Sequence, residues 1–184
     1  MSFLNNMIRH RSARISDRYT EVWKELADKY KPQRILSYGC GLGEECFSLT
    51  KHFPTAQIKG VDIQAKTIER AIAKNKFDNV SFEIANYESL LNNEHYDMIF
   101  AMNVFKIIKI SEKELNERYP LHVFDGQIID LIQLLKKDGL FIIDGSSYSI
   151  EQTSSYQKSL IDISCDTNTL WIKNKGKNCV FKKV

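Results

Sequence analysis

Three glycines and an aspartate form the clearest chemical pattern in this 184-residue chain. Gly39, Gly41 and Gly43 lie in the run Gly-Cys-Gly-Leu-Gly. Glycines let a backbone pack closely against a ligand because no Cβ atom stands in the way. Asp62 follows roughly 20 residues later, where an acid can accept hydrogen bonds from both hydroxyls of a ribose. The pattern therefore predicts a nucleoside site.

Two acids follow the glycine run and bear on the charge of that nucleoside. Glu44 stands where the dinucleotide fingerprint has its third glycine, and Glu45 comes next. The N–H groups at a helix start would otherwise hold a pyrophosphate, which two carboxylates would repel. They suit a nucleoside that carries positive charge and no phosphate. S-adenosylmethionine, with a sulfonium and an ammonium group, is such a molecule.

The segments around these residues alternate between strand and helix patterns. Runs rich in β-branched and aromatic residues predict strands at 34–38, 56–63, 80–85, 96–103 and 140–145. Apolar residues at helical spacing predict helices at 16–31, 44–53, 65–76 and 122–137. Such alternation is typical of an α/β fold with a doubly wound, parallel sheet. Two β-rich runs around residues 174–177 add a predicted hairpin, so we expect a mostly parallel sheet with an antiparallel strand at the carboxyl end.

Length and composition limit the class of protein. The chain is 43% hydrophobic and 27% charged, which fits one domain, at residues 32–184, after a short helical extension, at residues 1–31. Few glycines and prolines exclude disordered and collagen-like classes. No apolar run approaches the roughly 20 residues that cross a bilayer, and the amino end lacks a secretory signal. We therefore expect a cytoplasmic protein.

The cysteines and the charges add two expectations. The cysteines form no CxxC pair and have no histidine at metal-ligand spacing, so we expect reduced thiols and no metal site. The net charge of +3 divides into basic ends and an acidic centre, which suits a cationic ligand in the centre or an ordinary solvated surface. No aromatic stacking platform interleaves the lysines near the carboxyl end, which disfavours a nucleic-acid partner.

Five segments, in this order, resemble the class I S-adenosylmethionine-dependent methyltransferases. They are ILSYGCGLGEECFSL, GVDI, FEIANYESL, YDMIFAMNVF and LLKKDGLFIIDG, spread across residues 34–145. The resemblance implies a Rossmann-like methyltransferase sheet with a reversed final strand. It also implies S-adenosylmethionine as the cofactor.

The resemblance implies which residues bind that cofactor. The glycines would lie against its methionine part and ribose, Ile63 would pack on the adenine, and Asn86 would accept from the adenine amino group. Met102 and Asn103 would approach its amino acid end. Ser37 stands where members usually have an acid, so the cofactor ammonium would lose a common partner. The full expected set is Ser37, Tyr38, Gly39, Gly41, Gly43, Asp62, Ile63, Asn86, Tyr87, Met102 and Asn103.

A narrower resemblance concerns the acceptor. The run from Ser37 to Glu45 is similar to the loop of the chemotaxis-receptor glutamate methyltransferases, as is Asn103-Val104. Those enzymes have a longer amino-terminal helical domain and an inserted β-subdomain, for which we see no room here. The local match keeps a protein carboxylate open as the acceptor.

No catalytic residue follows from the sequence, because methyl transfer mainly needs the acceptor positioned and water excluded. His10, His95 and His122 are candidate bases; we prefer His10 and expect the other two to be exposed or structural. The motif that cradles planar exocyclic amines is absent, since Asn103 is followed by Val-Phe-Lys. Candidates for lining an acceptor pocket are Tyr19, Tyr38, Ser146, Ser147 and Tyr148.

We therefore expect a methyltransferase that acts on a small molecule. A protein carboxylate methyltransferase and a non-catalytic cofactor-binding protein are the alternatives. Residues 1–31 are the candidate lid over the pocket. The sequence predicts neither the acceptor's identity nor the oligomeric state.

Overall fold

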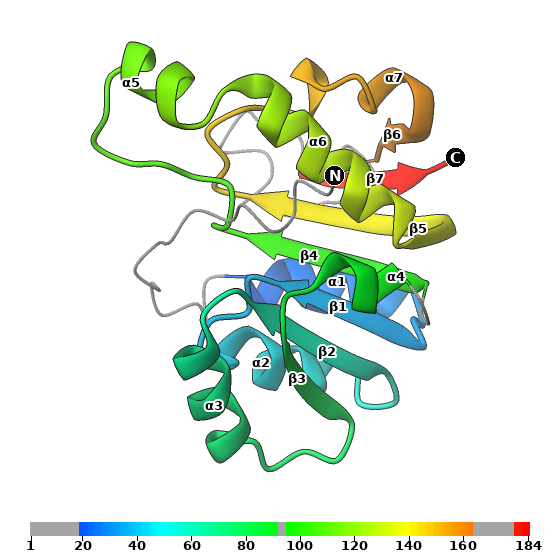
Figure 1. Cartoon of the computed structure of the whole chain (residues 1–184). Coiled ribbons are helices and arrows are strands. Elements are labelled where there is room, and N and C mark those ends of the chain that lie inside the picture. The colour runs from blue at the N-terminus through cyan, green and yellow to red at the C-terminus, as the bar shows by residue number, and fades with distance from the viewer. Residues whose placement is uncertain (1–18, 92–94, 164–178) are drawn as a thin grey trace.

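The computed structural model describes residues 19–91, 95–163 and 179–184, which build a seven-stranded sheet in the order β3-β2-β1-β4-β5-β7-β6 (Figure 1). The first five strands run parallel, and β7 runs antiparallel to both β5 and β6. The predicted class, a mostly parallel sheet with a reversed strand at the carboxyl end, is confirmed. The strands are β1 (Arg34–Tyr38), β2 (Gln57–Asp62), β3 (Val80–Ile84), β4 (Tyr96–Met102), β5 (Leu135–Asp144), β6 (Leu160–Asp162) and β7 (Val180–Lys183).

Helices cover both faces of the sheet. One apolar cluster joins α1, α2 and α3 to one face, and a second joins α4 and α6 to the other. In Figure 1, α4 and α6 lie in front of the sheet and α1 lies behind it. The helices are α1 (Thr20–Lys29), α2 (Glu44–His52), α3 (Ala65–Lys74), α4 (Tyr87–Leu91), α5 (Glu112–Arg118), α6 (Leu121–Gln133) and α7 (Tyr156–Ser159). None of these described helices is long and apolar enough to cross a bilayer.

The parallel strands bring their carboxyl ends to one edge of the sheet, which we call the carboxyl edge. Ser37 of β1 pairs with Gly60 of β2 on one side and with Phe100 of β4 on the other. Met102 at the end of β4 pairs with Asp144 at the end of β5. Polar residues at these strand ends therefore share one edge, which is where open α/β sheets bind ligands.

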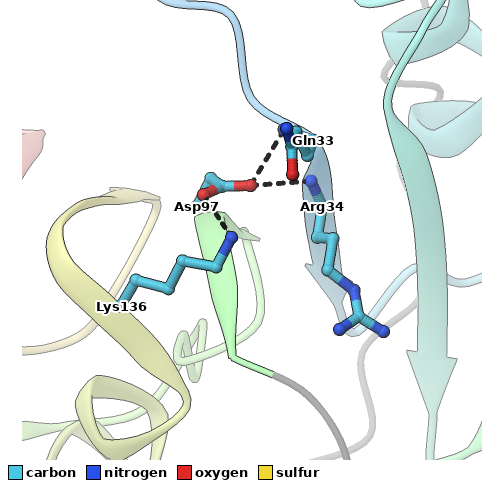
Figure 2. A network of polar contacts seen from close by, with 4 residues as sticks. All are labelled: Gln33, Arg34, Asp97 and Lys136. Atoms are coloured by element: carbon cyan, nitrogen blue, oxygen red, sulfur yellow. Dashed lines mark hydrogen bonds and ion pairs between the residues drawn. The ribbon is translucent and has the colours of Figure 1, made fainter.

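The opposite edge is held together by Asp97 (Figure 2). One carboxylate oxygen, Oδ2, accepts hydrogen bonds from the backbone N–H groups of Gln33 and Arg34, each at 2.8 Å. The other, Oδ1, lies 2.7 Å from the Lys136 ammonium. Partial burial raises the pKa of Asp97, but these bonds outweigh it and leave the pKa below its usual value. Asp97 thus ties the starts of β1, β4 and β5.

The helix predicted at 122–137 ends too late. In the structure α6 ends at Gln133 and β5 begins at Leu135, ahead of the expected strand start. The apolar pair Leu134-Leu135 suits a helix face equally well, but Leu135 pairs with Tyr96 across an irregularity in the β4–β5 ladder. Long-range pairing decides this boundary, and local periodicity does not show it.

Several other expectations concern the ends of the chain. The predicted turn at 174–177 lies outside the described residues, and the described partners of β7 are β5 and β6. The helix predicted at 16–31 appears as α1, and its residues 16–18 lie outside the described part. In α1, Val22, Trp23 and Leu26 are buried in the same cluster as α2. The domain boundary at residue 31 stays a prediction.

Candidate functional site

The glycine run forms a tight loop between β1 and α2. Gly39, Gly41 and Gly43 have φ angles of +74°, +55° and +83°, in the left-handed region that favours glycine. At Gly43 a Cβ atom would also lie 2.6 Å from the Phe82 ring. The backbone N–H groups of Gly39 and Cys40 donate to the Val61 carbonyl at 2.8 and 2.9 Å. The loop is therefore anchored to the end of β2.

Asp62 ends β2 beside this loop. Its Oδ2 accepts from the Gly41 N–H at 3.1 Å, and its Oδ1 accepts from the Gln64 N–H at 2.9 Å. Two backbone donors thus fix the carboxylate against the loop. Each carboxylate oxygen has room for a second donor. The structure therefore brings together the glycines and the aspartate that the sequence paired, in an arrangement that can accept two ribose hydroxyls.

A second carboxylate lies under the loop. The Ser37 hydroxyl donates a 2.7 Å hydrogen bond to Glu45 Oε1, and Glu45 is only 3% exposed. Its Oε2 is buried without a hydrogen-bond partner among the described residues. Burial raises the pKa of Glu45 to about 7, although the bond from Ser37 acts in the opposite direction. The sequence placed Glu45 in the first helical turn but gave no sign that it reaches Ser37.

A hydrogen-bonded group of three residues lies at the ends of β4 and β5. The Tyr19 hydroxyl donates to Asp144 Oδ2 at 2.6 Å and accepts from Asn103 Nδ2 at 2.8 Å. Asn103 has a φ of +58°, and its N–H donates to the Asp144 carbonyl at 2.7 Å. A Cβ atom at Gly145 would clash with the Asn103 side chain. Asn103 was expected at this edge and Tyr19 was a pocket candidate, whereas sequence reasoning missed Asp144.

The remaining expected cofactor residues lie just after β2 and β3 and at the end of β4. Asn86 is exposed, and its side-chain oxygen accepts from the Glu88 N–H at 3.1 Å, so it caps the start of α4. Tyr87 is buried, and its hydroxyl donates to Gln133. Ile63 is half-buried just beyond β2, and Met102 is buried at the end of β4. Their contacts with adenine or methionine stay predictions.

Two tyrosines expected near ligands serve the core. The Tyr38 ring stacks on Phe105 with centroids 5.8 Å apart, and burial raises the pKa of Tyr38 well above its usual value. Because the side chain of Tyr38 is buried in the core, only its backbone is available to a ligand at the glycine loop. The Tyr148 hydroxyl donates to the Tyr119 carbonyl at 2.8 Å. Aromatic side chains here fill the interior, as they commonly do.

The serines after β5 make local structural contacts. The Ser147 hydroxyl accepts from the Ile107 N–H at 2.9 Å, and the Ser146 hydroxyl donates to the Tyr148 carbonyl. Ser147 thereby joins the segment after β4 to the segment after β5. Both segments leave the carboxyl edge, so Ser147 helps to hold that edge in shape.

The candidate bases have separate positions. His95 is exposed and directly precedes β4, at the edge opposite the glycine loop. His122 is exposed in the first turn of α6. The expected exposure of His95 is confirmed, the structural role expected for His122 stays a prediction, and His10 lies outside the described residues. In the part of the chain that the structure describes, no group of three or more His, Cys, Asp or Glu residues could hold a metal ion.

Comparison with protein families decides the class. Residues 30–183 match the family described as Methyltransferase domain. The chain belongs to this methyltransferase family. The predicted family and its cofactor, S-adenosylmethionine, are therefore confirmed.

Curated relatives match part of this chain. Malonyl-[acyl-carrier protein] O-methyltransferase 1 of Ilyobacter polytropus is 31% identical over 127 residues, which is 64% of this chain and 47% of that protein. Trans-aconitate 2-methyltransferase of Pseudomonas paraeruginosa is 31% identical over 97 residues, 53% of this chain and 34% of that protein. The chain thus spans about half the length of the first of these relatives.

Solved methyltransferases share the fold. The N-methyltransferase NodS of Bradyrhizobium japonicum, in complex with S-adenosyl-L-homocysteine, aligns with a TM-score of 0.52 at 17% identity. The alignment covers 69% of this chain and 59% of that chain. Coclaurine N-methyltransferase aligns with a TM-score of 0.53 at 18% identity, covering 74% and 38%. At these identities the likeness shows the architecture alone.

The described residues fit a cofactor of this charge and shape. The glycine loop offers backbone without side chains, and Asp62 offers acceptors for hydroxyl groups. Oε2 of Glu45, without a hydrogen-bond partner among the described residues, adds an unsatisfied carboxyl oxygen under the loop. A nucleoside whose methionine part is cationic matches this combination, whereas a pyrophosphate does not.

Proposed function

We propose that this methyltransferase transfers the methyl group of S-adenosylmethionine to an oxygen of a small carboxylic acid. The observation that carries the proposal is the pair of curated relatives named for acids, a malonyl group and trans-aconitate. A carboxylate is already ionised at neutral pH, so its methylation needs no general base. The bound cofactor supplies an electrophilic methyl group, and the chain must orient the acceptor and exclude water.

The placement of the two candidate bases that the structure describes fits this acceptor class. Neither His95, at the opposite edge, nor the exposed His122 makes a described contact with the Tyr19–Asn103–Asp144 group. In that group the Tyr19 hydroxyl already donates its hydrogen bond to Asp144. An acceptor that must lose a proton would need a base here, whereas a carboxylate would not.

Positive charge beside the carboxyl edge supports an anionic acceptor. The segment after β4 carries Lys106 and Lys109, both exposed. The Ser147 hydroxyl accepts from the Ile107 N–H at 2.9 Å, and the Ser147 N–H donates to the Phe105 carbonyl at 2.7 Å. These two hydrogen bonds hold the segment to the residues that follow β5. Two lysines on a tethered segment attract a carboxylate and raise its local concentration near the edge.

A carrier-bound acid is the second candidate acceptor. Five of the curated relatives are named malonyl-[acyl-carrier protein] O-methyltransferases, so their acceptors are attached to a protein. The same segment after β4 exposes 56% of Ile108 between its lysines, which suits a partner that is both acidic and apolar. This candidate retains the chemistry of the first and changes only what carries the carboxylate.

Methyl transfer from tritiated S-adenosylmethionine tests the proposal. We expect label in free malonate or trans-aconitate, or in malonyl-acyl-carrier protein, and none in primary amines. Replacing both Lys106 and Lys109 by glutamate should lower kcat/KM for the acid about tenfold or more. A double glutamine variant of the exposed Lys51 and Lys74, remote from the edge, is the control.

Two outcomes would contradict the proposal. Transfer to amines with none to acids would overturn the acceptor class. Tight cofactor binding without transfer to any acceptor would favour the non-catalytic alternative. Transfer to the carrier-bound acid alone would select the second candidate over the first.

A further inference from the structure

Glu45 is a buried acid with half of its carboxyl group unsatisfied. Oε1 accepts from Ser37, but Oε2 has no partner, and Glu45 forms no ion pair with any described residue. A buried carboxylate without a counter-charge costs free energy, which a bound cation can recover. The carboxyl group is therefore arranged to respond to positive charge.

The Glu45 carboxyl group lies under the glycine loop. Its side chain crosses from the first turn of α2 to Ser37 in β1, and residues 39–43 close the connection between these two elements. Glu45 and Asp62 both raise the pKa of the Cys40 thiol within that loop, after its bond to Cys46 and its own burial. The carboxyl group thus acts electrostatically on the loop itself.

We propose that Glu45 is the counter-charge for the cationic methionine end of the cofactor, and that cofactor binding expels the Glu45 proton. Ser37 leaves the end of β1 without the acid that the family resemblance leads us to expect there. The Ser37–Glu45 bond brings an acid to that same place from α2. The inference rests on the family's cofactor. It adds Glu45 as a binding residue and adds the release of the Glu45 proton as a consequence of binding.

The groups around Glu45 set the direction of the effect. Ser37 donates to it from β1, and Glu45 acts on the Cys40 thiol of the loop, which Cys46 and Asp62 also influence. From α1, which packs against α2, Trp23 contributes a buried indole N–H that also has no partner. None of these groups is a cation, so burial dominates and raises the pKa of Glu45 to about 7.

The pH dependence follows from this direction. Before binding, about half of the molecules carry the Glu45 proton at pH 7. A bound cation lowers the pKa, so binding at pH 7 should release about half a proton. Cofactor affinity should rise as the pH increases toward 7 and become constant about one unit above it. An acid with an ordinary pKa would already be ionised and would release no proton.

Calorimetry in two buffers of different ionisation enthalpy, phosphate and Tris, measures that proton. With wild-type protein and S-adenosylmethionine we expect release of about half a proton at pH 7. The isosteric Glu45→Gln variant should release none, bind at least tenfold more weakly above pH 8 and show no pH dependence through pH 7. Glu69→Gln, exposed on α3 and outside the proposed site, is the matched control and should behave like wild type.

A second variant covers the case in which Glu45→Gln does not fold. Ser37→Ala removes the bond that holds the Glu45 pKa down, so the pH midpoint of binding should move upward. Binding of the cofactor without proton release, or an unchanged midpoint in Ser37→Ala, would overturn this inference and leave the family's cofactor intact. Absence of any binding by the wild type would overturn both.

Discussion

The hydroxyl of Tyr19 donates a 2.6 Å hydrogen bond to Asp144, 125 residues further along the chain. Tyr19 immediately precedes α1, and Asp144 ends β5, so this bond fastens the amino-terminal helix to the carboxyl edge of the sheet. Asn103 completes the attachment by donating to the same hydroxyl. This part of the carboxyl edge therefore depends on the contact of a helix with two strand ends.

Removing this hydroxyl should loosen the edge. Tyr19→Phe deletes both hydrogen bonds but keeps the buried ring, so we expect a loss of about 1–2 kcal/mol in the free energy of unfolding. We also expect weaker cofactor binding, because Asn103 loses the partner that fixes its side chain. Urea unfolding and calorimetry measure the two effects. Tyr30→Phe, at the other end of the same helix, is the control, and equal behaviour of the two variants would contradict the attachment.

Asp97 should stabilise the fold without affecting the site. Asp97→Asn removes the charge that binds Lys136 and two backbone N–H groups, so we expect a loss of about 1–3 kcal/mol, toward the lower end because both side chains are partly exposed. Cofactor affinity should not change, since this edge lies opposite the glycine loop. Asp138→Asn, which breaks a more exposed pair with Lys182, is the control and should cost less.

The pH dependence of stability gives a further test of Asp97. Its pKa is lowered in the folded protein, so its contribution is fully present above the unfolded value of about 4 and is lost as the pH falls through the folded value. The difference in stability between wild type and Asp97→Asn should therefore shrink below pH 4. A difference that stays constant down to pH 2 would show that the charge is not responsible.

Gly43 should tolerate no side chain. Gly43→Ala places a Cβ atom 2.6 Å from Phe82 and requires a left-handed φ of +83°, so we expect a loss of about 2–4 kcal/mol, combining strain with overpacking. Thermal unfolding measures the loss. In a Phe82→Ala background the same substitution should cost less, because the clash with Phe82 is removed and only the backbone strain and a 3.0 Å contact with Phe47 are left. An equal cost in both backgrounds would contradict the packing argument.

Local patterns were sufficient to predict the five parallel strands and the glycine loop, but they gave no sign of the short strand β6. Strand alternation, the left-handed glycines and Asp62 all depend on short stretches of sequence, and β1 to β4 appear close to their predicted positions. The boundary between α6 and β5 was misplaced because Leu134 and Leu135 suit either element until Tyr96 pairs with the strand. Asn86 was expected to bind adenine; its oxygen accepts from Glu88, and an adenine contact stays a prediction.

The parts of the site that escaped prediction depend on contacts between distant elements. In the sequence, Glu45 is only an acid at the start of a helix. The structure shows that its side chain accepts a hydrogen bond from Ser37. In the sequence, Asp144 is only the last residue of a buried strand. The structure shows that it accepts a hydrogen bond from the Tyr19 hydroxyl. Both are buried acids with hydroxyl partners, and no spacing rule in one sequence links such pairs.

Calorimetry with Asp62→Ala tests the central claim most directly, that the cofactor lies on the glycine loop at the carboxyl edge. Asp62→Ala removes the acceptors proposed for the ribose hydroxyls, so affinity for S-adenosylmethionine should fall at least tenfold. Asp78→Ala, outside the helices and strands and exposed, is the control and should bind like wild type. Circular dichroism confirms that both variants fold. An affinity unchanged in folded Asp62→Ala would contradict the account.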